Sequence, residues 1–285
     1  MKISDERAKV IRRIEELEAA GIFDLDVEDD PPTVPLDASR VDYTCKKLST
    51  RMGTWIANRV GKAFFEKKIR NGELIIKEIR GIENFKAIAD RGALITCNHF
   101  HPFDNYAVYK AIEPQMNGNM LYKIIREGNY TSFKGFYGYL FRHCNTLPLS
   151  SSLSGMKALL SAVKELLARG EKILIYPEQS MWYNYKKPKP LKVGAFSFAV
   201  KNNAPVLPIF ITLEDTENFD SDGCLIQAYT IHILPPLFPD KSLNSRENCR
   251  MLCRENYRLW KEVYEDFYGK KLEYTTKGEV EICSI

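Results

Sequence analysis

From near residue 73 onward, short β-rich runs alternate regularly with helical patterns along this chain. The runs are rich in Ile, Leu, Val and Tyr, whereas the apolar residues between them recur every three or four positions. The runs cover 72–79, 92–98, 118–125, 172–177 and 205–213, and the helical patterns cover 107–112, 153–170 and 191–203. Such alternation predicts an α/β fold with parallel strand pairs in its sheet.

Two further elements complete the predicted domain. Residues 226–237 have the pattern of a late strand, and residues 243–268 have that of a helix with aromatic residues on its inner side. We therefore expect a mixed, partly parallel sheet flanked by helices over residues 71–285.

The composition is that of an ordinary globular domain. Hydrophobic residues make up 45% and charged residues 27% of the 285 positions, which excludes a disordered or fibrous chain. No run approaches the roughly 18 uncharged apolar residues of a membrane-spanning helix, and the amino terminus lacks the apolar centre of a secretory signal. The seven cysteines are scattered and odd in number. We therefore expect a cytoplasmic protein with free thiols.

The first 70 residues are predicted to form a helical segment ahead of this domain. Residues 5–20 have a narrow apolar stripe among mixed charges, which is typical of an amphipathic helix. The following stretch, 22–37, is acidic and contains three prolines, so an extended connector is expected there.

A basic helix is predicted next. Apolar residues recur at helical spacing over 41–69, which indicates a long helix or a helical pair bent near Gly61. Residues 40–70 carry nine Lys or Arg against Asp42 and Glu66. A basic helix with Trp and Phe on its apolar side can lie in an anionic bilayer surface, or it can dock on its own domain.

The stretch NHFHPFD at 98–104 carries the clearest chemistry. Pro102 suits the first position of a helix that follows the strand, which places Asp104 in the first helical turn. A histidine still in the loop can fold back to meet that carboxylate. Asp104 would then fix the tautomer of His99 and leave the other ring nitrogen as a general base for a hydroxyl or amine.

Two other interpretations of the same residues stay open. In the structural one, His101 caps the helix, Asp104 favours the helix dipole and His99 fills a pocket. In the second, these three side chains bind a metal, although the sequence has no HExxH motif and only His143 and His232 as further histidines.

The stretch NHFHPFD resembles the NHx(S)xxD signature of glycerolipid acyltransferases of the 1-acylglycerol-3-phosphate acyltransferase type, in which the His and Asp of an HxxxxD motif form the catalytic pair. Later blocks have counterparts in the same order. LIYPEQS stands where a strand ending in FPEG(T/S) belongs, LKVGAFSFA is similar to the following FKxGA helix, and APVLPIFI to the final hydrophobic block. TLPLSSS lies where a GxIPxxR block usually stands. On these motifs, which span residues 94–211, the chain is identified as a member of that family.

The resemblance implies a single acyltransferase-type α/β domain over 71–285, preceded at 1–70 by a helical segment that contacts a membrane. His99 would be the general base, Asp104 its orienting acid, and Glu178 an acidic residue that shapes or binds the acceptor pocket. Further residues expected to bind substrate are Asn98, Gln179 and Ser180.

The acceptor side departs from the family pattern. Phosphate-accepting members carry arginines in the GxIPxxR and FPEGTRS blocks, and Ser151 and Met181 stand at those positions here. Gln179 replaces a glycine, and His101 replaces a serine. The pocket is therefore expected to be less cationic, and lysophosphatidic acid is not the expected acceptor. Other residues that could hold a phosphate are Lys123, Arg126, Arg142, Lys186, Lys187 and Lys189, the last three being expected in a solvated loop.

These observations predict a peripheral membrane acyltransferase of lipid and phospholipid metabolism, on the cytoplasmic, inner face of an anionic membrane. Acyl-CoA or acyl carrier protein would supply the acyl thioester, and a hydroxyl or amine of a lipid-like molecule would accept it. No metal, other cofactor or nucleic acid is expected to take part. The alternatives are a catalytically silent lipid-binding relative and a metal-dependent hydrolase.

Overall fold

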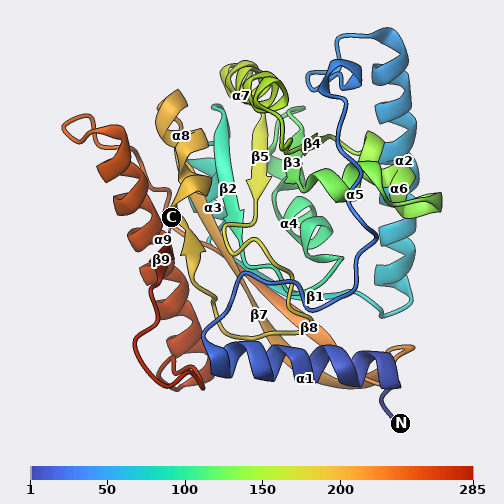
Figure 1. Ribbon diagram of the computed structural model, residues 1–285, viewed down its shortest axis with the longest axis vertical. Helices are drawn as coiled ribbons and strands as arrows, with labels where there is room; N and C mark the ends of the chain where they lie inside the picture. Colours follow the sequence, from blue (N-terminus) through green and yellow to red (C-terminus); the bar gives the residue numbers. More distant parts are fainter. Residues whose placement is uncertain (1, 285) are drawn as a thin grey trace.

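The computed structural model describes residues 2–284 and has a seven-stranded sheet with helices on both faces (Figure 1). The strand order is β1-β8-β7-β2-β5-β3-β4, in which β7 and β8 pair antiparallel and the other neighbours pair parallel. The strands are β1 (Ile75–Arg80), β2 (Ala93–Cys97), β3 (Leu121–Ile125), β4 (Thr146–Pro148), β5 (Lys172–Ile175), β7 (Val206–Phe219) and β8 (Leu225–Ile233). The predicted α/β fold with a mixed sheet is confirmed.

The sheet separates two hydrophobic core layers, each covered by helices. One face of the sheet packs on α7, α8 and α9, and the other packs on α3, α4 and the inner side of α2. The helices are α1 (Asp5–Ala20), α2 (Leu48–Arg70), α3 (Ile82–Lys86), α4 (Asp104–Ile112), α5 (Glu127–Thr131), α6 (Gly135–His143), α7 (Leu153–Ala168), α8 (Ser197–Asn202) and α9 (Ser245–Tyr268).

The central strand β2 positions the site. All five of its residues are buried, because β2 lies between β7 and β5 and is covered by helices on both faces. Strands buried on both faces read as continuous apolar runs, as ALITC does. The carboxyl end of β2, where open α/β sheets place ligands, leads directly into residues 98–104.

The carboxyl-terminal part differs from the sequence-based expectation in two ways. The helix predicted over 191–203 begins instead as β6 (Leu191–Lys192), which pairs with β9 (Cys283–Ser284) before the chain turns into α8. That pairing brings Cys283 beside α9, where it forms a disulfide with Cys253. The expectation of seven free thiols is therefore wrong for these two residues, since a contact across 30 positions left no local signal.

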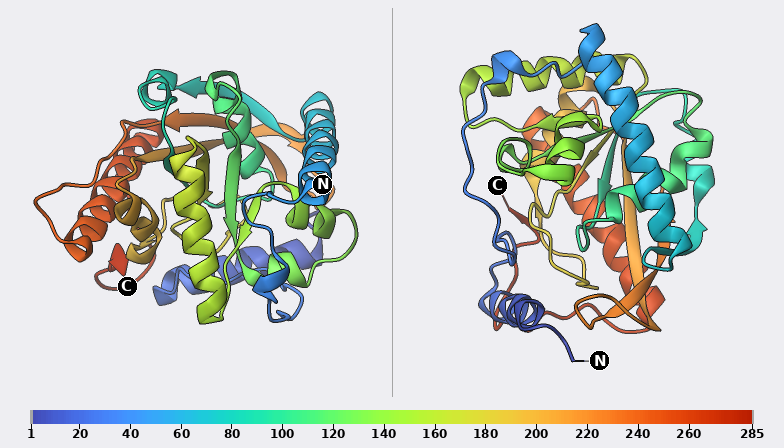
Figure 2. Two further views of the ribbon diagram at one scale, coloured as in Figure 1. Left: turned by 90° about the horizontal axis from the view of Figure 1, so that it is seen from above. Right: turned by 90° about the vertical axis from the view of Figure 1, so that its right-hand side faces the viewer.

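The amino-terminal segment frames one side of the molecule. Helix α1 and the connector pack through Val10, Ile14 and Phe23 against Trp182, in a small core of their own. The connector then crosses the front of the domain to reach α2, which runs unbroken along one edge (Figures 1 and 2). The bend expected near Gly61 is not found. The division of the chain at residue 70 stays a prediction.

Among residues 2–284, no helix combines the length and the apolar character needed to cross a bilayer.

Candidate active site

The loop after β2 brings His99 and Asp104 together. Helix α4 begins at Asp104, two residues later than Pro102 suggested, and the His99 ring folds back over this first turn. His99 Nδ1 lies 2.8 Å from Asp104 Oδ2. The backbone N–H groups of Phe100 and His101 donate to the same oxygen at 3.2 and 3.3 Å.

The surroundings of this pair fix its chemistry. Asp104 is fully buried, and its carboxylate can only accept hydrogen bonds from the donors around it. His99 Nδ1 must therefore carry the proton and donate, which leaves Nε2 as a free base. The His99 side chain is 23% exposed and lines a cavity, so a substrate can reach this nitrogen.

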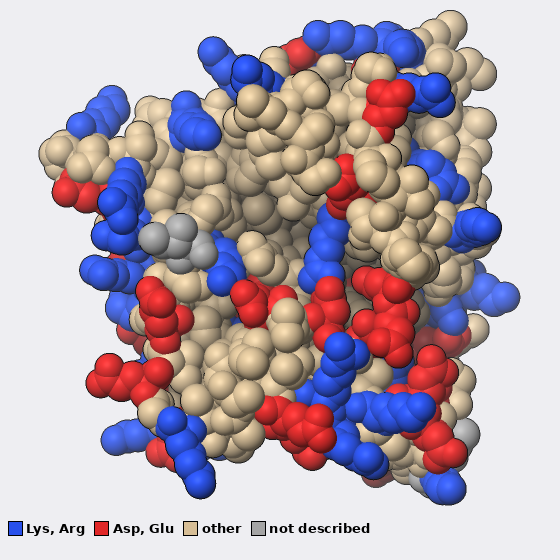
Figure 3. Space-filling model, in the orientation of Figure 1, with Lys and Arg blue, Asp and Glu red and all other residues tan. Residues whose placement is uncertain are grey.

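The cavity next to His99 is large and chemically divided. Its volume is about 1420 Å³, and it opens on the face shown in Figure 3, where acidic and basic side chains alternate below the hollow. Its polar part includes residues of α1, the connector and the β7–β8 turn, namely Arg7, Asp24, Asp26, Glu28, Asp220 and Asp222. Its apolar part lies among α6, α7 and α8 and includes Leu140, Phe141, Leu149, Met156, Leu160 and Phe198.

Glu178 lies beside the His99 loop without lining the cavity. Its carboxylate accepts from the backbone N–H of His99 at 3.0 Å and from that of Lys189 at 2.8 Å. The Lys189 ammonium lies 3.9 Å away, and both side chains are almost fully buried. Burial raises the pKa of Glu178 and lowers that of Lys189 to about 8. Glu178 thus holds the loop by accepting a hydrogen bond from the backbone of His99. Lys189 is buried and is not the solvated charge that was expected.

Asn98 and Ser180 are likewise held by the protein. The Asn98 amide exchanges two hydrogen bonds with the backbone of Ile211. The Ser180 hydroxyl donates to the carbonyl of Phe23 and accepts from Lys189. Both side chains are buried outside the cavity lining, so their placement does not support the predicted contact with substrate.

Three other predicted binding residues do line the cavity: Lys123, Arg126 and Gln179. Arg126 forms an ion pair with Asp26 of the connector and donates to the carbonyl of Gln179 at 2.7 Å. Gln179 adopts a left-handed conformation with φ of 67°, at the position where the family pattern has glycine. Lys123 has no ion pair within residues 2–284, and burial lowers its pKa.

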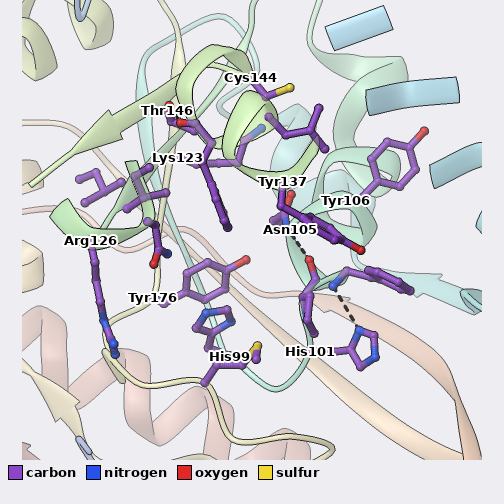
Figure 4. Close-up of a pocket in the computed structure, with 18 of the residues that line it drawn as sticks. His99, His101, Asn105, Tyr106, Lys123, Arg126, Tyr137, Cys144, Thr146 and Tyr176 are labelled. Atoms are coloured by element: carbon purple, nitrogen blue, oxygen red, sulfur yellow. Dashed lines mark hydrogen bonds between the residues drawn. The ribbon is translucent and has the colours of Figure 1, made fainter. Parts of the chain in front are cut away.

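His101 also faces the cavity, but it does not cap α4. Its Nδ1 accepts from the backbone N–H of Phe103 at 3.2 Å, as Figure 4 shows. Burial lowers the pKa of His101 to about 4, so the ring is neutral near pH 7 and presents Nε2–H. No group of three or more His, Cys, Asp or Glu within residues 2–284 is arranged to hold a metal ion. The alternative in which His99, His101 and Asp104 bind a metal therefore has no such ligand group among these residues.

Comparison with known families decides the enzyme class. Residues 77–212, which contain both the His99 loop and the strand end that carries Glu178, match the family model described as Acyltransferase. Residues 77–212 therefore form an acyltransferase domain by this match. This confirms the recognition based on the motifs and establishes the protein as an acyltransferase.

Solved structures include a similar protein. It is the 1-acyl-sn-glycerophosphate (LPA) acyltransferase PlsC from Thermotoga maritima, with a TM-score of 0.48 and 19% sequence identity. The alignment covers 79% of this acyltransferase and 81% of that chain. A search among curated proteins gives no match.

Sequence reasoning missed two residues around the acyltransferase site. Asp26 neutralises Arg126 from a connector that seemed to lie outside the domain. Tyr176 contacts both members of the His99–Asp104 pair, yet in the sequence it was only the aromatic residue before a Pro-Glu motif. The chemical identity of both residues was visible in the sequence, but their contacts depend on the tertiary fold.

Proposed function

We propose that this acyltransferase moves a fatty acyl group from a thioester donor to a hydroxyl or amine of a lipid-like acceptor, with His99 as the general base. The observation that carries the proposal is the contact between His99 and the buried Asp104 at the edge of a large, partly apolar cavity. A base oriented by a carboxylate and open to a binding cavity is the arrangement that activates such nucleophiles.

The proposed reaction needs no covalent enzyme intermediate. His99 Nε2 takes the proton as the acceptor oxygen or nitrogen attacks the thioester carbonyl carbon. The tetrahedral intermediate then breaks its C–S bond, and the imidazolium returns the proton to the leaving thiolate. Cys97, the nearest cysteine in sequence, is fully buried, and burial raises the pKa of its thiol, which argues against a role as nucleophile.

The apolar part of the cavity suits the acyl chain. Burying a methylene group contributes roughly 0.8 kcal/mol, so a long chain is best held where Leu, Met and Phe side chains surround it. The side chains among α6, α7 and α8 offer such an environment, and Leu160 and Phe198 belong to it. The polar part near α1 and the connector remains for the acceptor head group.

The charges in the polar part favour an acceptor without a strongly bound phosphate. Arg126 is paired with Asp26, and Arg7 is paired with Glu28 and Asp222, so neither guanidinium is free to grip a phosphate. This agrees with Ser151 and Met181 at the positions where phosphate-accepting members carry arginines. Lys123 and Lys201 also line the cavity and form no ion pair within residues 2–284, so they remain for an anionic group.

Helix α2 supports binding to an anionic membrane. Five of its large apolar side chains are between 40% and 70% exposed: Leu48, Met52, Trp55, Ile56 and Val60. Basic residues lie along the same helix, and Arg59 packs its guanidinium over the Trp55 ring. An apolar stripe with basic neighbours fits a bilayer surface that carries negative charge, and we place the enzyme peripherally on the inner, cytoplasmic face.

The test is acyl transfer by purified protein on anionic vesicles that contain a lipid extract. Acyl-CoA and acyl carrier protein are supplied separately, the released thiol is measured, and mass spectrometry identifies the lipid that gains an acyl group. We expect His99→Ala to lower transfer by about 10² to 10⁴-fold. His143→Gln, a change at the carboxyl end of α6 outside the cavity lining, is the matched control.

Each outcome of this test is informative. Wild-type turnover by His99→Ala would reject the proposed base. Absence of thiol release by the wild-type protein with both donors would favour the silent lipid-binding alternative. Transfer with only one donor would identify the cosubstrate.

A further inference from the structure

Tyr176 lies next to the catalytic pair because of the register of two parallel strands. Ile175, the last residue of β5, pairs with Thr96 near the end of β2. The residues that follow both strands therefore leave the sheet side by side, and Tyr176 lies beside the His99 loop. Figure 4 shows the Tyr176 ring directly over the His99 ring at the cavity wall.

Two contacts join Tyr176 to the two catalytic side chains. Its hydroxyl donates to Asp104 Oδ1 at 2.5 Å, on the carboxylate oxygen that His99 does not use. Its ring stacks on the His99 imidazole with centroids 3.9 Å apart and an interplanar angle of 16°. Burial and the Asp104 charge raise the pKa of Tyr176, so the hydroxyl keeps its proton and remains a donor.

We propose that Tyr176 is a positioning residue that sets both the orientation and the basicity of His99. Its ring acts on the imidazole directly, and its hydroxyl acts through the Asp104 carboxylate. This inference rests on the proposed role of His99 as general base. The hydroxyl would act by withdrawing negative charge from Asp104, and the ring would act by holding the imidazole in one plane. Neither contact requires Tyr176 to touch the substrate.

The hydroxyl contact has a direction that can be measured. A carboxylate that accepts a second strong hydrogen bond stabilises a neighbouring imidazolium less well. Removal of the Tyr176 hydroxyl should therefore strengthen the attraction of Asp104 for an imidazolium, an effect that the acid limb of the rate profile would report.

The ring contact acts at a different stage. In the proposed reaction His99 becomes an imidazolium, and a cation over the face of an aromatic ring is attracted by the ring quadrupole. The stacked ring also removes rotational freedom about the His99 side chain, so that Nε2 points into the cavity. Loss of the ring should therefore lower the rate more than loss of the hydroxyl alone.

The experiment compares Tyr176→Phe and Tyr176→Leu with Tyr268→Phe as the control. Tyr268 also has a partly buried hydroxyl, which donates to the backbone carbonyl of Leu213 at 3.0 Å, and Tyr268 does not line the cavity. The kcat of acyl transfer is measured from about pH 5 to 9, with the thioester donor and the lipid extract that support transfer by the wild-type protein. The melting temperature of each variant separates loss of stability from loss of rate.

We expect Tyr176→Phe to move the acid limb of the rate profile upward by about half to one pH unit, with a two- to tenfold lower plateau. Tyr176→Leu should lower the plateau by a further factor of about ten. Tyr268→Phe should leave the position of the acid limb unchanged even if its melting temperature falls.

Two results would separate failure of this inference from failure of the proposed function. If His99→Ala is inactive but Tyr176→Phe keeps the wild-type acid limb and plateau, the role assigned to Tyr176 is wrong and the general base stands. If His99→Ala retains full turnover, the proposed function itself is wrong, whatever the Tyr176 variants do.

Discussion

The loop between β2 and α4 differs from the outer side of α2 in how its side chains are covered. The key carboxylates at the loop are buried, whereas the outer apolar side chains of α2 are exposed. In the loop, Asp104 uses both carboxylate oxygens on protein donors, and Glu178 holds the backbone of His99 from below. On α2, Trp55 and its apolar neighbours are between 40% and 70% exposed. The first region makes its contacts within the protein, whereas the second presents the apolar area that the proposed membrane contact would cover.

This difference has a functional meaning. General-base chemistry needs atoms fixed to within about half an ångström, and a buried hydrogen-bond network provides that precision. Binding to a fluid bilayer needs apolar area and positive charge, but no fixed geometry. Mutations in the loop should therefore change rate and folding, and mutations on α2 should change location alone.

The largest effect is expected at Asp104. Asp104→Asn keeps the shape of the side chain but removes the negative charge that stabilises the His99 imidazolium formed in the proposed reaction. We expect kcat to fall by about 10² to 10⁴-fold, measured by thiol release under saturating donor. Asp29→Asn, at an exposed carboxylate paired with Arg13, is the control and should keep wild-type activity. A rate within twofold of wild type for Asp104→Asn would show that the pair is structural.

The next effect concerns folding. Glu178→Gln leaves the buried Lys189 ammonium without its nearest carboxylate and places an amide near two backbone donors. Removing one member of a buried pair costs about 3 kcal/mol or more, so the free energy of unfolding in urea should fall by about that amount. Glu255→Gln, in an exposed pair with Arg258, should cost less than about 0.5 kcal/mol. Equal losses of unfolding free energy for both variants would show that the buried contacts of Glu178 do not stabilise the fold.

The sequence was a good guide to the parts of this molecule that follow local patterns. Strand β2 was predicted from its short β-rich run at 92–98, and the His99–Asp104 contact followed from the geometry of a strand, a turn and a helix start. The same local reasoning predicted the basic helix α2, although it placed the start seven residues too early.

Contacts between distant segments explain what the sequence could not show. Glu178 was expected to shape or bind the acceptor pocket. Its carboxylate contacts the backbone N–H groups of His99 and Lys189, which only the folded chain brings together. The pairing of Asp26 with Arg126 spans 100 positions. The helix expected at Leu191 is replaced by a strand because the carboxyl-terminal β9 is available as its partner.

A third prediction tests the outer side of α2. The triple change Met52→Ser, Trp55→Ser and Val60→Ser removes apolar area that is already exposed, so the unfolding free energy should change little. Transfer of these side chains into a bilayer contributes about 1.5 to 3 kcal/mol in total after partial burial, so binding to anionic vesicles should weaken roughly 10- to 100-fold. Vesicle sedimentation measures this effect. Phe238→Ser, which removes a half-exposed side chain near the start of α9, is the control.

A change of charge sharpens the same prediction. Lys47→Glu and Arg51→Glu should weaken binding by about 1 kcal/mol for each lost basic residue, and the effect should shrink as salt increases. If both sets of variants bind vesicles as strongly as the wild-type protein does, α2 is not the membrane-binding surface.

The smallest effect is expected from histidines buried as neutral rings. Burial lowers the pKa of His232 to about 4, against about 6.5 in an unfolded chain, and its Nε2 lies 3.0 Å from the Thr212 hydroxyl. Between these two values the unfolded state binds a proton that the folded state does not, so this contribution to stability is full above pH 6.5 and is lost as the pH falls toward 4. We expect a loss of roughly 1 to 2 kcal/mol from this residue between pH 7 and 5, measured by urea unfolding. His232→Gln should reduce that pH dependence, whereas His143→Gln, at a partly exposed ring, should reduce it less; equal slopes for wild type and His232→Gln would show that the ring accepts its proton without unfolding.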